Sequence, residues 1–539
     1  MVALLRCTYY IANPTFKRTK MNRIKASLAA RVMELRQSSK RRYIVSGFLL
    51  TAGALVALSF TAPTPAPMPA EQTVVEYTAP VRPDALTPHD RALYQSIYLS
   101  QDVGDFVKAD EMIAQLDSQL LLGHVLAQRY MHKDYKSEPR ELKAWVENFS
   151  DHPEAAKIRA LASRKGAKIE AQPRQEAALR GAGYIDHLGG RSMPSGWYHG
   201  LSLWREQSYG KAANQFEKVA SNEKLSEWHR AAAYYWAYRA YDKLNDDAAD
   251  GMLELAAEYP TTFYGMLAGA KLGDSGSWMA AAPYVPSSLR RNEAVLRAQA
   301  LASIDREEDA EEELRALFSK LSRHERKAMV TLASEFNLPN LQVRLSRMKE
   351  LTDEEALFAS YPMPQAVASV QASIEPAMIF AISRQESGFR PDVASGAGAV
   401  GMMQVLPSTA NHIVRRLGEH KLAGGDKSVI EQMQLKDAST NVRLGAAYID
   451  MLMDEPSVNG SLIHAIASYN AGPGAVAGWA KAARTINDPL LYIESIPYSE
   501  TRNYVVQVLA HYWVYQHLMG EQAMTLQALA DGHWPQYVS

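Results

Sequence analysis

Apolar residues recur at every third or fourth position over most of residues 88–348, which is the spacing of one face of an α-helix. The runs pair into helical hairpins at 201–220 with 225–244, at 248–258 with 261–272, and at 293–304 with 307–321. Thr87 followed by Pro88 is typical of a helix start, with the threonine as N-cap. Because strand signals are absent from this stretch, the pattern predicts an α-superhelical array of hairpins, similar to a degenerate helical repeat.

Aromatic residues are concentrated in the first of these hairpins, where their type would also suit stacking on a carbohydrate. Their helical spacing favours a core between hairpins instead, and we assign no catalytic role to them. The residues are Trp204, Trp228, Tyr234, Tyr235, Trp236, Tyr238 and Tyr241.

The most informative helix is expected at 376–387, with Pro376 at its first position and Gly388 just after its end. Counted in helical steps, Glu386 prolongs an apolar stripe formed by residues 378, 379 and 382. A carboxyl group among apolar neighbours has a raised pKa and can hold a proton near neutrality, as a general acid must. The alternative is a solvated glutamate in the last turn of a core helix.

The same helical pattern continues at 407–417, 441–453, 460–469 and 500–518. A span of this length suits one compact domain. We therefore predict a mainly all-α protein, with an α-superhelical domain at 88–348, a linker at 349–364, an α-rich domain at 365–520 and a C-terminal tail at 521–539 to which the pattern assigns no structure.

The N-terminal residues have a different character. Residues 1–42 carry eleven basic side chains against one acid, Glu34, although the net charge of the 539-residue chain is only −1. An apolar run at 44–60 follows directly, and basic residues before an apolar segment are typical of export with the tail left in the cytoplasm. The sequence predicts a basic tail at 1–42, a signal peptide or membrane anchor at 43–62 and a Pro-rich linker at 63–87. It does not predict nucleic-acid binding.

The fate of the apolar run stays open. Its length is at the lower limit for a spanning helix, about 17–25 residues, and the prolines after it make poor cleavage sites. Both cleavage and retention as an inner-membrane anchor remain consistent with the sequence. The single cysteine, Cys7, precedes the run, so the exported part has no disulfide and depends on a large core.

Four short motifs follow one another in the last domain, and although each is weak alone, their order is specific. They are Glu386-Ser387, Gly401-Met402-Met403-Gln404, Ser468-Tyr469-Asn470-Ala471-Gly472 and Ile496-Pro497-Tyr498-Ser499-Glu500-Thr501-Arg502. With these motifs the sequence resembles the lytic transglycosylases that have a goose-lysozyme-like fold (glycoside hydrolase family 23). From about residue 88 onward it also resembles, less sharply, the helical region of the large soluble members.

The resemblance implies a lysozyme-like catalytic domain in which Glu386 is the catalytic residue. Glu500 is expected beside the sugar groove, although an acid in the first turn of a helix already offsets the helix dipole. The expected substrate-binding residues are Ser387, Met403, Gln404, Tyr469, Asn470 and Glu500.

The expected reaction follows from the same resemblance. Glu386 would act first as acid and then as base, cutting peptidoglycan between N-acetylmuramic acid and N-acetylglucosamine without water and leaving 1,6-anhydromuramyl ends in the periplasm. The alternatives are a hydrolytic muramidase on the same scaffold and a helical-repeat scaffold that binds peptidoglycan without turnover. Partners among cell-wall enzymes are not identified by the sequence.

Patterns for cofactors and metals do not support another chemistry. Residues 396–401 match the dinucleotide fingerprint G-x-G-x-x-G, but a helix and a Pro-containing turn precede them where that motif requires a strand. We interpret this stretch as a flexible glycine loop that lets backbone approach a ligand. His511 and His517 are six residues apart, unlike the four-residue spacing of helical zinc motifs. The sequence therefore predicts no cofactor and no metal.

Overall fold

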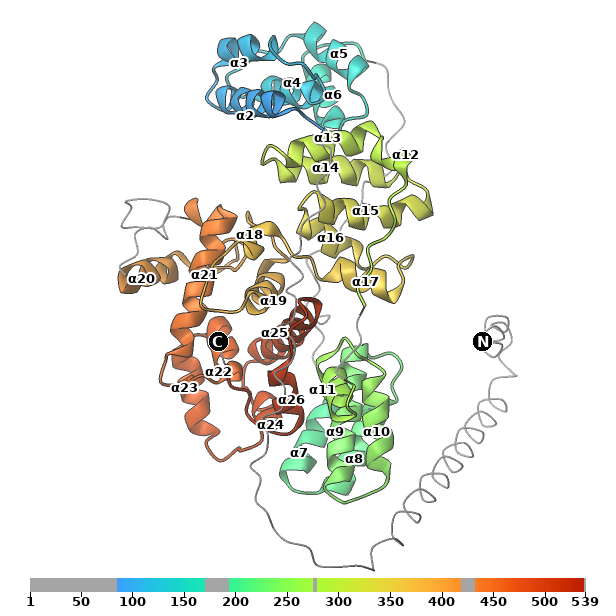
Figure 1. Ribbon diagram of the computed structural model, residues 1–539, viewed down its shortest axis with the longest axis vertical. Helices are drawn as coiled ribbons and strands as arrows, with labels where there is room; N and C mark the ends of the chain where they lie inside the picture. Colours follow the sequence, from blue (N-terminus) through green and yellow to red (C-terminus); the bar gives the residue numbers. More distant parts are fainter. Residues whose placement is uncertain (1–84, 170–192, 275–278, 418–431, 538–539) are drawn as a thin grey trace, which may run out of the picture. The chain divides into compact units, whose positions relative to one another are not determined.

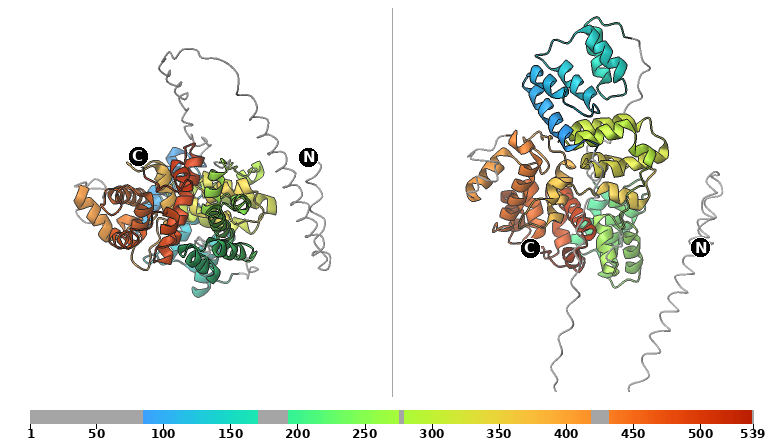
Figure 2. Two further views of the ribbon diagram at one scale, coloured as in Figure 1. Left: turned by 90° about the horizontal axis from the view of Figure 1, so that it is seen from below. Right: turned by 45° about the horizontal axis from the view of Figure 1, so that its top comes forward.

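The computed structural model describes residues 85–169, 193–274, 279–417 and 432–537. Within these ranges every regular element is a helix, apart from three isolated β-bridges (Figures 1 and 2). This confirms the predicted all-α class. No helix among the described residues is long and apolar enough to cross a membrane. The basic tail, the apolar run at 44–60 and most of the Pro-rich linker lie outside the described residues.

The helical array is built from short antiparallel helices. Thr87 caps the first of them by accepting a hydrogen bond from the backbone N–H of Asp90, as the sequence predicted. The helices are α2 (Pro88–Asp102), α3 (Phe106–Ile113), α4 (Leu122–Met131), α5 (Pro139–Asn148), α6 (Ala155–Arg164), α7 (Ser195–Arg205), α8 (Tyr209–Ala220), α9 (Glu227–Asp242), α10 (Ala248–Ala257), α11 (Phe263–Lys271), α12 (Ser287–Arg290), α13 (Glu293–Ala302), α14 (Glu307–Phe318), α15 (Arg323–Glu335), α16 (Pro339–Leu345) and α17 (Asp353–Ser360).

The last part of the chain contains the expected helices, close to their predicted bounds, and further short ones. They are α18 (Gln365–Ala368), α19 (Pro376–Ser387), α20 (Pro407–Leu417), the 3-10 helix η3 (Gln434–Lys436), α21 (Ala438–Met453), α22 (Leu462–Ala471), α23 (Pro473–Ala482), α24 (Pro489–Ile493), α25 (Ser499–Leu518) and α26 (Met524–Ala530). The tail to which the sequence assigned no structure therefore contains a helix, and its Leu526 and Leu529 are buried in the core.

The aromatic residues of α7–α9 form a core, as predicted. Trp197, Trp204 and Trp236 are buried, and the first two each pack edge to face on Trp236. Trp228, Tyr234 and Tyr241 are partly buried and pack against the same cluster. Each aromatic side chain buries a large apolar area, and we therefore assign these residues to the packing between hairpins.

The hairpins of α7–α11 share this core with the C-terminal helices. Phe263 of α11 stacks on Trp513 of α25, with ring centroids 5.3 Å apart. Tyr264 donates a hydrogen bond of 2.6 Å to Glu494, and Arg239 forms an ion pair with Asp488. Helices that are more than 200 residues apart in sequence are thus held together by both apolar and polar contacts.

Helices α2–α4 have a separate core, shared with α13–α16. Buried Tyr94, Val125, Ala298 and Leu314 belong to it. A smaller cluster around Trp145 fills the space between α4, α5 and α6. The array is therefore not one uninterrupted stack with a single core, which agrees with the degenerate repeat seen in the sequence.

Candidate active site

Helix α19 is buried on all sides over its first two turns, where residues 377–382 are at most 2% exposed. It ends where the sequence predicted, because Gly388 takes the left-handed conformation at φ 62° and its N–H bonds back to the Arg384 carbonyl. Phe389 follows at φ 65° and is 1% exposed. A phenylalanine in the left-handed backbone conformation costs about 1 kcal/mol or more of folding free energy. Burial of the Phe389 ring offsets this cost and so stabilises the turn that follows Glu386.

Glu386 lies in the last turn of α19 and is only partly exposed. Tyr504 of α25 donates a hydrogen bond of 2.6 Å from its hydroxyl to Glu386 Oε1. Burial raises the pKa of Glu386 to about 7, the nearby charge of Glu500 adds to this, and the Tyr504 hydrogen bond opposes it. The raised pKa is the property that the apolar stripe on α19 predicted.

Tyr504 was not predicted as a site residue. It lies one helical turn after Glu500, and a tyrosine on the same face of a helix as a motif acid is the only local signal that could have found it. Its side chain is 5% exposed, and burial raises its own pKa well above the usual value, so it stays a hydrogen-bond donor near neutrality.

The loop at 393–405 folds against the end of α19. Isolated bridges join Ala394 to Val400 and Val400 to Val405, which closes the loop into a small hairpin-like turn. Gln404 lies at its end with φ 48°, and its side-chain amide donates to the carbonyls of Val393 (3.2 Å) and Gly401 (2.9 Å). The glycine loop that the sequence predicted to be flexible is therefore held by its own hydrogen bonds.

A second residue that was not predicted, Asn441 of α21, fixes this loop by hydrogen bonds to its backbone. It is fully buried, and its amide nitrogen donates to the carbonyls of Val400 (2.8 Å) and Leu435 (2.9 Å). Its amide oxygen accepts from the backbone N–H of Met403 at 2.8 Å. A buried polar group with satisfied hydrogen bonds fixes the backbone it contacts.

Two of the predicted substrate-binding side chains lie beneath the loop. Ser387 is 4% exposed, and its hydroxyl donates to the Met402 carbonyl at 2.7 Å. The Met403 side chain is fully buried against α21, next to Gly445. We therefore correct the direct substrate contact predicted for these two side chains to a role in holding the loop, because neither presents a free surface.

The other predicted residues surround Glu386 from different elements. Tyr469 donates from its hydroxyl to the Met403 carbonyl at 2.8 Å, and burial together with the charge of Glu386 raises its pKa. Asn470 accepts a hydrogen bond of 2.6 Å from Thr501 through its amide oxygen. Glu500 is exposed in the first turn of α25, at the predicted helix start. The four motifs are thus brought together at one place.

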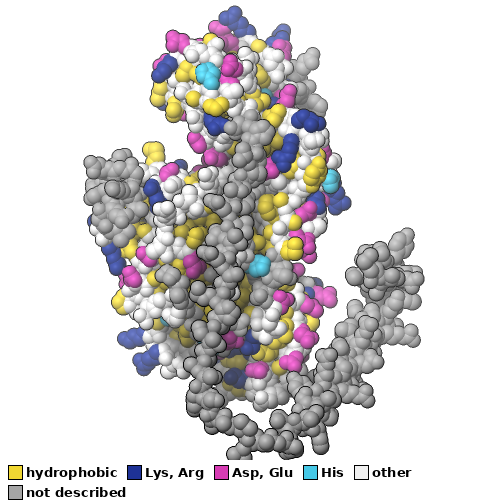
Figure 3. Space-filling model, viewed as in Figure 1, with side chains coloured by type: hydrophobic (Ala, Val, Ile, Leu, Met, Phe, Trp, Pro, Cys, Tyr) yellow, Lys and Arg dark blue, Asp and Glu magenta, His cyan; other side chains and the backbone are white. Residues whose placement is uncertain are grey.

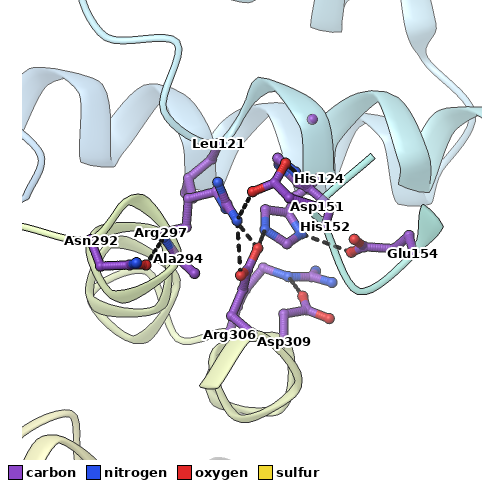
Figure 4. Close-up of polar contacts among 12 residues, drawn as sticks. Leu121, His124, Asp151, His152, Glu154, Asn292, Ala294, Arg297, Arg306 and Asp309 are labelled. Atoms are coloured by element: carbon purple, nitrogen blue, oxygen red, sulfur yellow. Dashed lines mark hydrogen bonds and ion pairs between the residues drawn. The ribbon is translucent and has the colours of Figure 1, made fainter. Parts of the chain in front are cut away.

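One group of side chains among the described residues has the chemistry of metal ligands, namely His124, His152 and Glu313, whose candidate ligand atoms lie within 4.8 Å of one another. His124 Nδ1 lies 2.7 Å from Glu154 (Figure 4), and its Nε2 lies 2.8 Å from Glu313. Arg297 donates to both carboxylate oxygens of Glu313. His124 and Glu313 thus each have hydrogen-bond partners within the protein.

The charge state of His124 follows from these hydrogen bonds. Burial lowers its pKa, but the hydrogen bonds to Glu154 and Glu313 outweigh burial and raise the pKa to about 9. The ring is therefore an imidazolium near neutrality, with both nitrogens donating to carboxylates. We interpret the cluster as an ion-pair network that joins α4 to α14.

Comparison with known proteins agrees with this arrangement of motifs. Residues 363–490 match the family model described as "Transglycosylase SLT domain". The matched residues include Glu386, the loop at 393–405, Tyr469 and Asn470. The resemblance read from the four motifs is thereby confirmed. A second model, described as "Soluble lytic transglycosylase helical domain", matches residues 495–523, which cover α25.

Curated relatives extend the likeness beyond the SLT domain. The chain is 30% identical over 276 residues to a soluble lytic murein transglycosylase of Salmonella typhimurium, covering 50% of this chain and 41% of the relative. It is 37% identical over 152 residues to that of Escherichia coli, covering 28% and 22%. The chain thus spans less than half the length of these relatives.

A solved structure of the 70 kDa soluble lytic transglycosylase from Escherichia coli has a similar fold, with a TM-score of 0.54 at 22% sequence identity. The match covers 84% of this chain and 64% of that chain. It confirms the predicted fold class, an α-superhelix followed by a lysozyme-like domain that here carries the SLT motifs.

Proposed function

We propose that the chain is a lytic murein transglycosylase that cleaves the β-1,4 bond between N-acetylmuramic acid and N-acetylglucosamine in peptidoglycan. The observation that carries this proposal is Glu386, a half-buried carboxyl group with its pKa raised to about 7, inside a domain that matches the SLT model. A group with a pKa near the ambient pH can both give and take a proton during one reaction.

The proposed reaction uses this one carboxyl group twice. Protonated Glu386 gives its proton to the oxygen that links the two sugars, and the bond from that oxygen to the muramyl C1 breaks. The acetamido group of the substrate stabilises the cationic centre at C1. The Glu386 carboxylate then takes the proton from the muramyl C6 hydroxyl, whose oxygen bonds to C1 and closes a 1,6-anhydro ring. No water is consumed, and Glu386 ends protonated as it began.

The surrounding residues have distinct roles in this proposal. Tyr504 stabilises the carboxylate form of Glu386 by its hydrogen bond, which favours proton release. Gln404 and Asn470 are partly exposed polar residues from two different motifs and suit contacts with the sugar amides. Tyr469 fixes the loop by its hydrogen bond to the Met403 carbonyl. It also lies close enough to Glu386 for the charge of that carboxylate to raise its pKa.

The proposed place of action is the periplasm, where peptidoglycan is found. Its basis is the basic tail followed by the apolar run at 44–60, which lies outside the described residues. Retention of this run would associate the enzyme with the inner membrane. Other cell-wall enzymes as partners are not specified by any described surface.

The test is digestion of purified sacculi by the wild type and by Glu386→Gln, with the products analysed by mass spectrometry. We expect anhydromuropeptides from the wild type and a loss of rate of at least about 10²–10⁴-fold in the variant. Glu375→Gln is a matched control, because Glu375 also accepts a tyrosine hydroxyl, that of Tyr512, at 2.6 Å but lies at the other end of α19.

Each other outcome contradicts a specific part of the proposal. Reducing ends in place of anhydro ends would indicate a hydrolytic muramidase. Undiminished release by Glu386→Gln would remove Glu386 from the mechanism. Binding of sacculi by the wild type with no release at all would favour a peptidoglycan-binding scaffold.

A further inference from the structure

Glu494 is an acidic residue buried between α11 and α25. Side chains of Asp, Glu, Lys and Arg are spread over the described face of the molecule in Figure 3, whereas that of Glu494 is only 7% exposed. Burial raises the pKa of Glu494, and the hydrogen bond from Tyr264 and the charge of Arg502 oppose this rise. Because burying a charge costs free energy, a buried acid outside the proposed reaction indicates a further role.

The two oxygens of Glu494 face two different helices. Tyr264 of α11 donates from its hydroxyl to Oε1 at 2.6 Å, and the same hydroxyl oxygen accepts from the indole N–H of Trp236 of α9 at 3.0 Å. Arg502 of α25 forms an ion pair with Oε2 at 3.9 Å, which is longer than a hydrogen bond but is attractive where water is largely excluded. Trp236 and Tyr264 are at most 4% exposed. Glu494 thus joins the aromatic core of the array to the first turns of α25.

Arg502 ties the start of α25 to its surroundings. Its Nη1 donates to the Ile496 carbonyl at 3.0 Å, in the connection that leads from α24 to α25. Its Nη2 donates to the hydroxyl of Tyr198 of α7 at 3.4 Å. The N-cap of α25 is Tyr498, whose side chain makes no capping hydrogen bond to the first turn in the described chain. The contacts of Arg502 therefore fix a helix start that has no side-chain cap.

The same turns of α25 carry two side chains that contact the active-site residues. Thr501 donates from its hydroxyl to the Asn470 amide oxygen at 2.6 Å. Tyr504, two residues after Arg502, donates to Glu386 at 2.6 Å. A hydrogen bond weakens steeply when its donor moves or tilts. A displacement of these turns would therefore weaken the hydrogen bond that opposes the raised pKa of Glu386.

We propose that Glu494 is a positioning residue for the active site. It connects Tyr264 of the array to Arg502, and this connection holds the first turns of α25 where the Tyr504 hydroxyl meets Glu386. The helical array thereby acts on the site through α25. The effect on catalysis rests on the proposed function, whereas the connection itself can be measured without turnover.

The first variant is Tyr264→Phe, which removes one hydroxyl and keeps the buried ring. The experiment measures kcat and KM on solubilised glycan strands as a function of pH. We expect kcat to fall roughly threefold to tenfold with KM unchanged, because the link acts on the acid and not on the bound glycan. The alkaline limb of kcat/KM should move to higher pH, in the direction expected for loss of the Tyr504 hydrogen bond and by less.

Two further variants keep the test decisive. Glu494→Gln leaves one acceptor oxygen, which can serve Tyr264 or face Arg502 but not both, so it should repeat the effect even where Tyr264→Phe folds poorly. Tyr241→Phe is the matched control, because Tyr241 of α9 donates to Glu217 of α8 at 2.7 Å, an equivalent pair within the array. It should leave kcat and the pH profile unchanged.

A double variant tests the route through Tyr504. Tyr264→Phe should move the pH profile of the wild type but not that of Tyr504→Phe, which has no hydroxyl left to position. Equal shifts in both backgrounds would overturn this route. Unchanged profiles of folded Tyr264→Phe and Glu494→Gln, or the same shift in Tyr241→Phe, would overturn the role of Glu494.

A titration of Glu386 by NMR, with glutamate labelled at its carboxyl carbon, separates failure of this link from failure of the proposed function. The signal of Glu386 is identified by its absence from Glu386→Gln. We expect its titration midpoint to rise in Tyr264→Phe and to keep the wild-type value in Tyr241→Phe. A wild type that cuts no glycan, together with this rise, would overturn the enzyme assignment and leave the link. The same midpoint in all three proteins would overturn the link.

Discussion

Tyr504 of α25 donates a hydrogen bond of 2.6 Å to Glu386 at the end of α19, across 118 residues of sequence. Burial and the charge of Glu500 raise the pKa of Glu386, whereas this hydrogen bond lowers it. The resulting value of about 7 is a balance of opposing effects. Such a balance suits a group that must donate a proton and later accept one.

Replacing Tyr504 by phenylalanine removes the effect that favours the carboxylate. The pKa of Glu386 should rise further, by about 1 pH unit for one charge-assisted hydrogen bond. The alkaline limb of the pH profile of kcat/KM reports this group in the free enzyme, so it should move to higher pH. The first step should slow, because Glu386 without this hydrogen bond releases its proton less readily.

Tyr512→Phe is the control for this profile. Tyr512 lies on the same helix and donates to Glu375 at 2.6 Å, so the substitution removes an equivalent pair away from the site. Its profile should coincide with that of the wild type. A profile of Tyr504→Phe that moves to lower pH would show that the hydroxyl favours the acid form of Glu386.

The raised pKa of Glu386 also costs stability at neutral pH. Below its unfolded pKa of 4.5 the group is protonated in both states, and between 4.5 and about 7 the unfolded chain loses its proton first, so stability falls as the pH rises. Glu386→Gln should therefore be more stable than the wild type by about 2 kcal/mol at pH 8, with allowance for partial exposure, and equal to it near pH 4. Denaturant unfolding at both pH values measures this.

Glu500→Gln serves as the comparison in this measurement, because Glu500 is an exposed carboxylate beside the same site. Its stability should equal that of the wild type near pH 4 and exceed it at pH 8 by much less than that of Glu386→Gln, because the charge of Glu500 causes only a part of the raised pKa of Glu386. Equal stability of Glu386→Gln and the wild type at pH 8 would contradict the raised pKa.

The local features of the site could be predicted from the sequence, and the long-range ones could not. Helix α19, its end at Gly388 and the raised pKa of Glu386 depend on residues within a few positions of one another. Tyr504 and Asn441 depend on helices that meet far along the chain, α25 with α19 and α21 with the loop at 393–405. No spacing in the sequence indicates such a meeting.

The motifs also could not tell a side chain that faces a ligand from one that holds backbone. Ser387 and Met403 belong to the same motifs as Glu386 and Gln404, yet their side chains are buried. Motif membership reflects both kinds of role, and only the direction of each side chain separates them. The helix in the C-terminal tail was also not predicted. α26 buries Leu526 and Leu529, but its seven residues are too few to show a helical periodicity in the sequence.

The loop at 393–405 offers a test of close packing separate from backbone strain. Gly398 and Gly401 have nearly the same left-handed φ, 85° and 86°. A methyl group at Gly401 would meet the amide of Asn441 and lie 2.5 Å from the Leu435 carbonyl, whereas at Gly398 it would meet only Gln432, at 3.9 Å. Gly401→Ala should destabilise by about 3 kcal/mol or more and Gly398→Ala by about 1 kcal/mol.

Activity assays at a temperature where both proteins are folded complete this comparison. Gly401→Ala should lose most of its activity, because the backbone that carries Gln404 is displaced, and Gly398→Ala should retain it. Equal destabilisation of the two variants would show that the φ angle alone explains the glycines and that Asn441 does not hold the loop closely.

The imidazolium of His124 makes the stability of the helical array depend on pH in a separate window. Its pKa is raised to about 9 by Glu154 and Glu313, above 6.5 in the unfolded chain, so the stabilisation is full below pH 6.5 and is lost as the pH rises through 9. This amounts to about 3 kcal/mol for a buried group. Replacing His124 by glutamine should remove this dependence, so that unfolding free energies measured at pH 6 and pH 9.5 differ less than in the wild type. His152→Gln changes a second buried histidine of the same cluster and should keep the wild-type dependence of stability on pH. If the stability of His124→Gln still fell between pH 6 and pH 9.5 as in the wild type, the proton lost in this window would belong to another group. That result would contradict the ion-pair network.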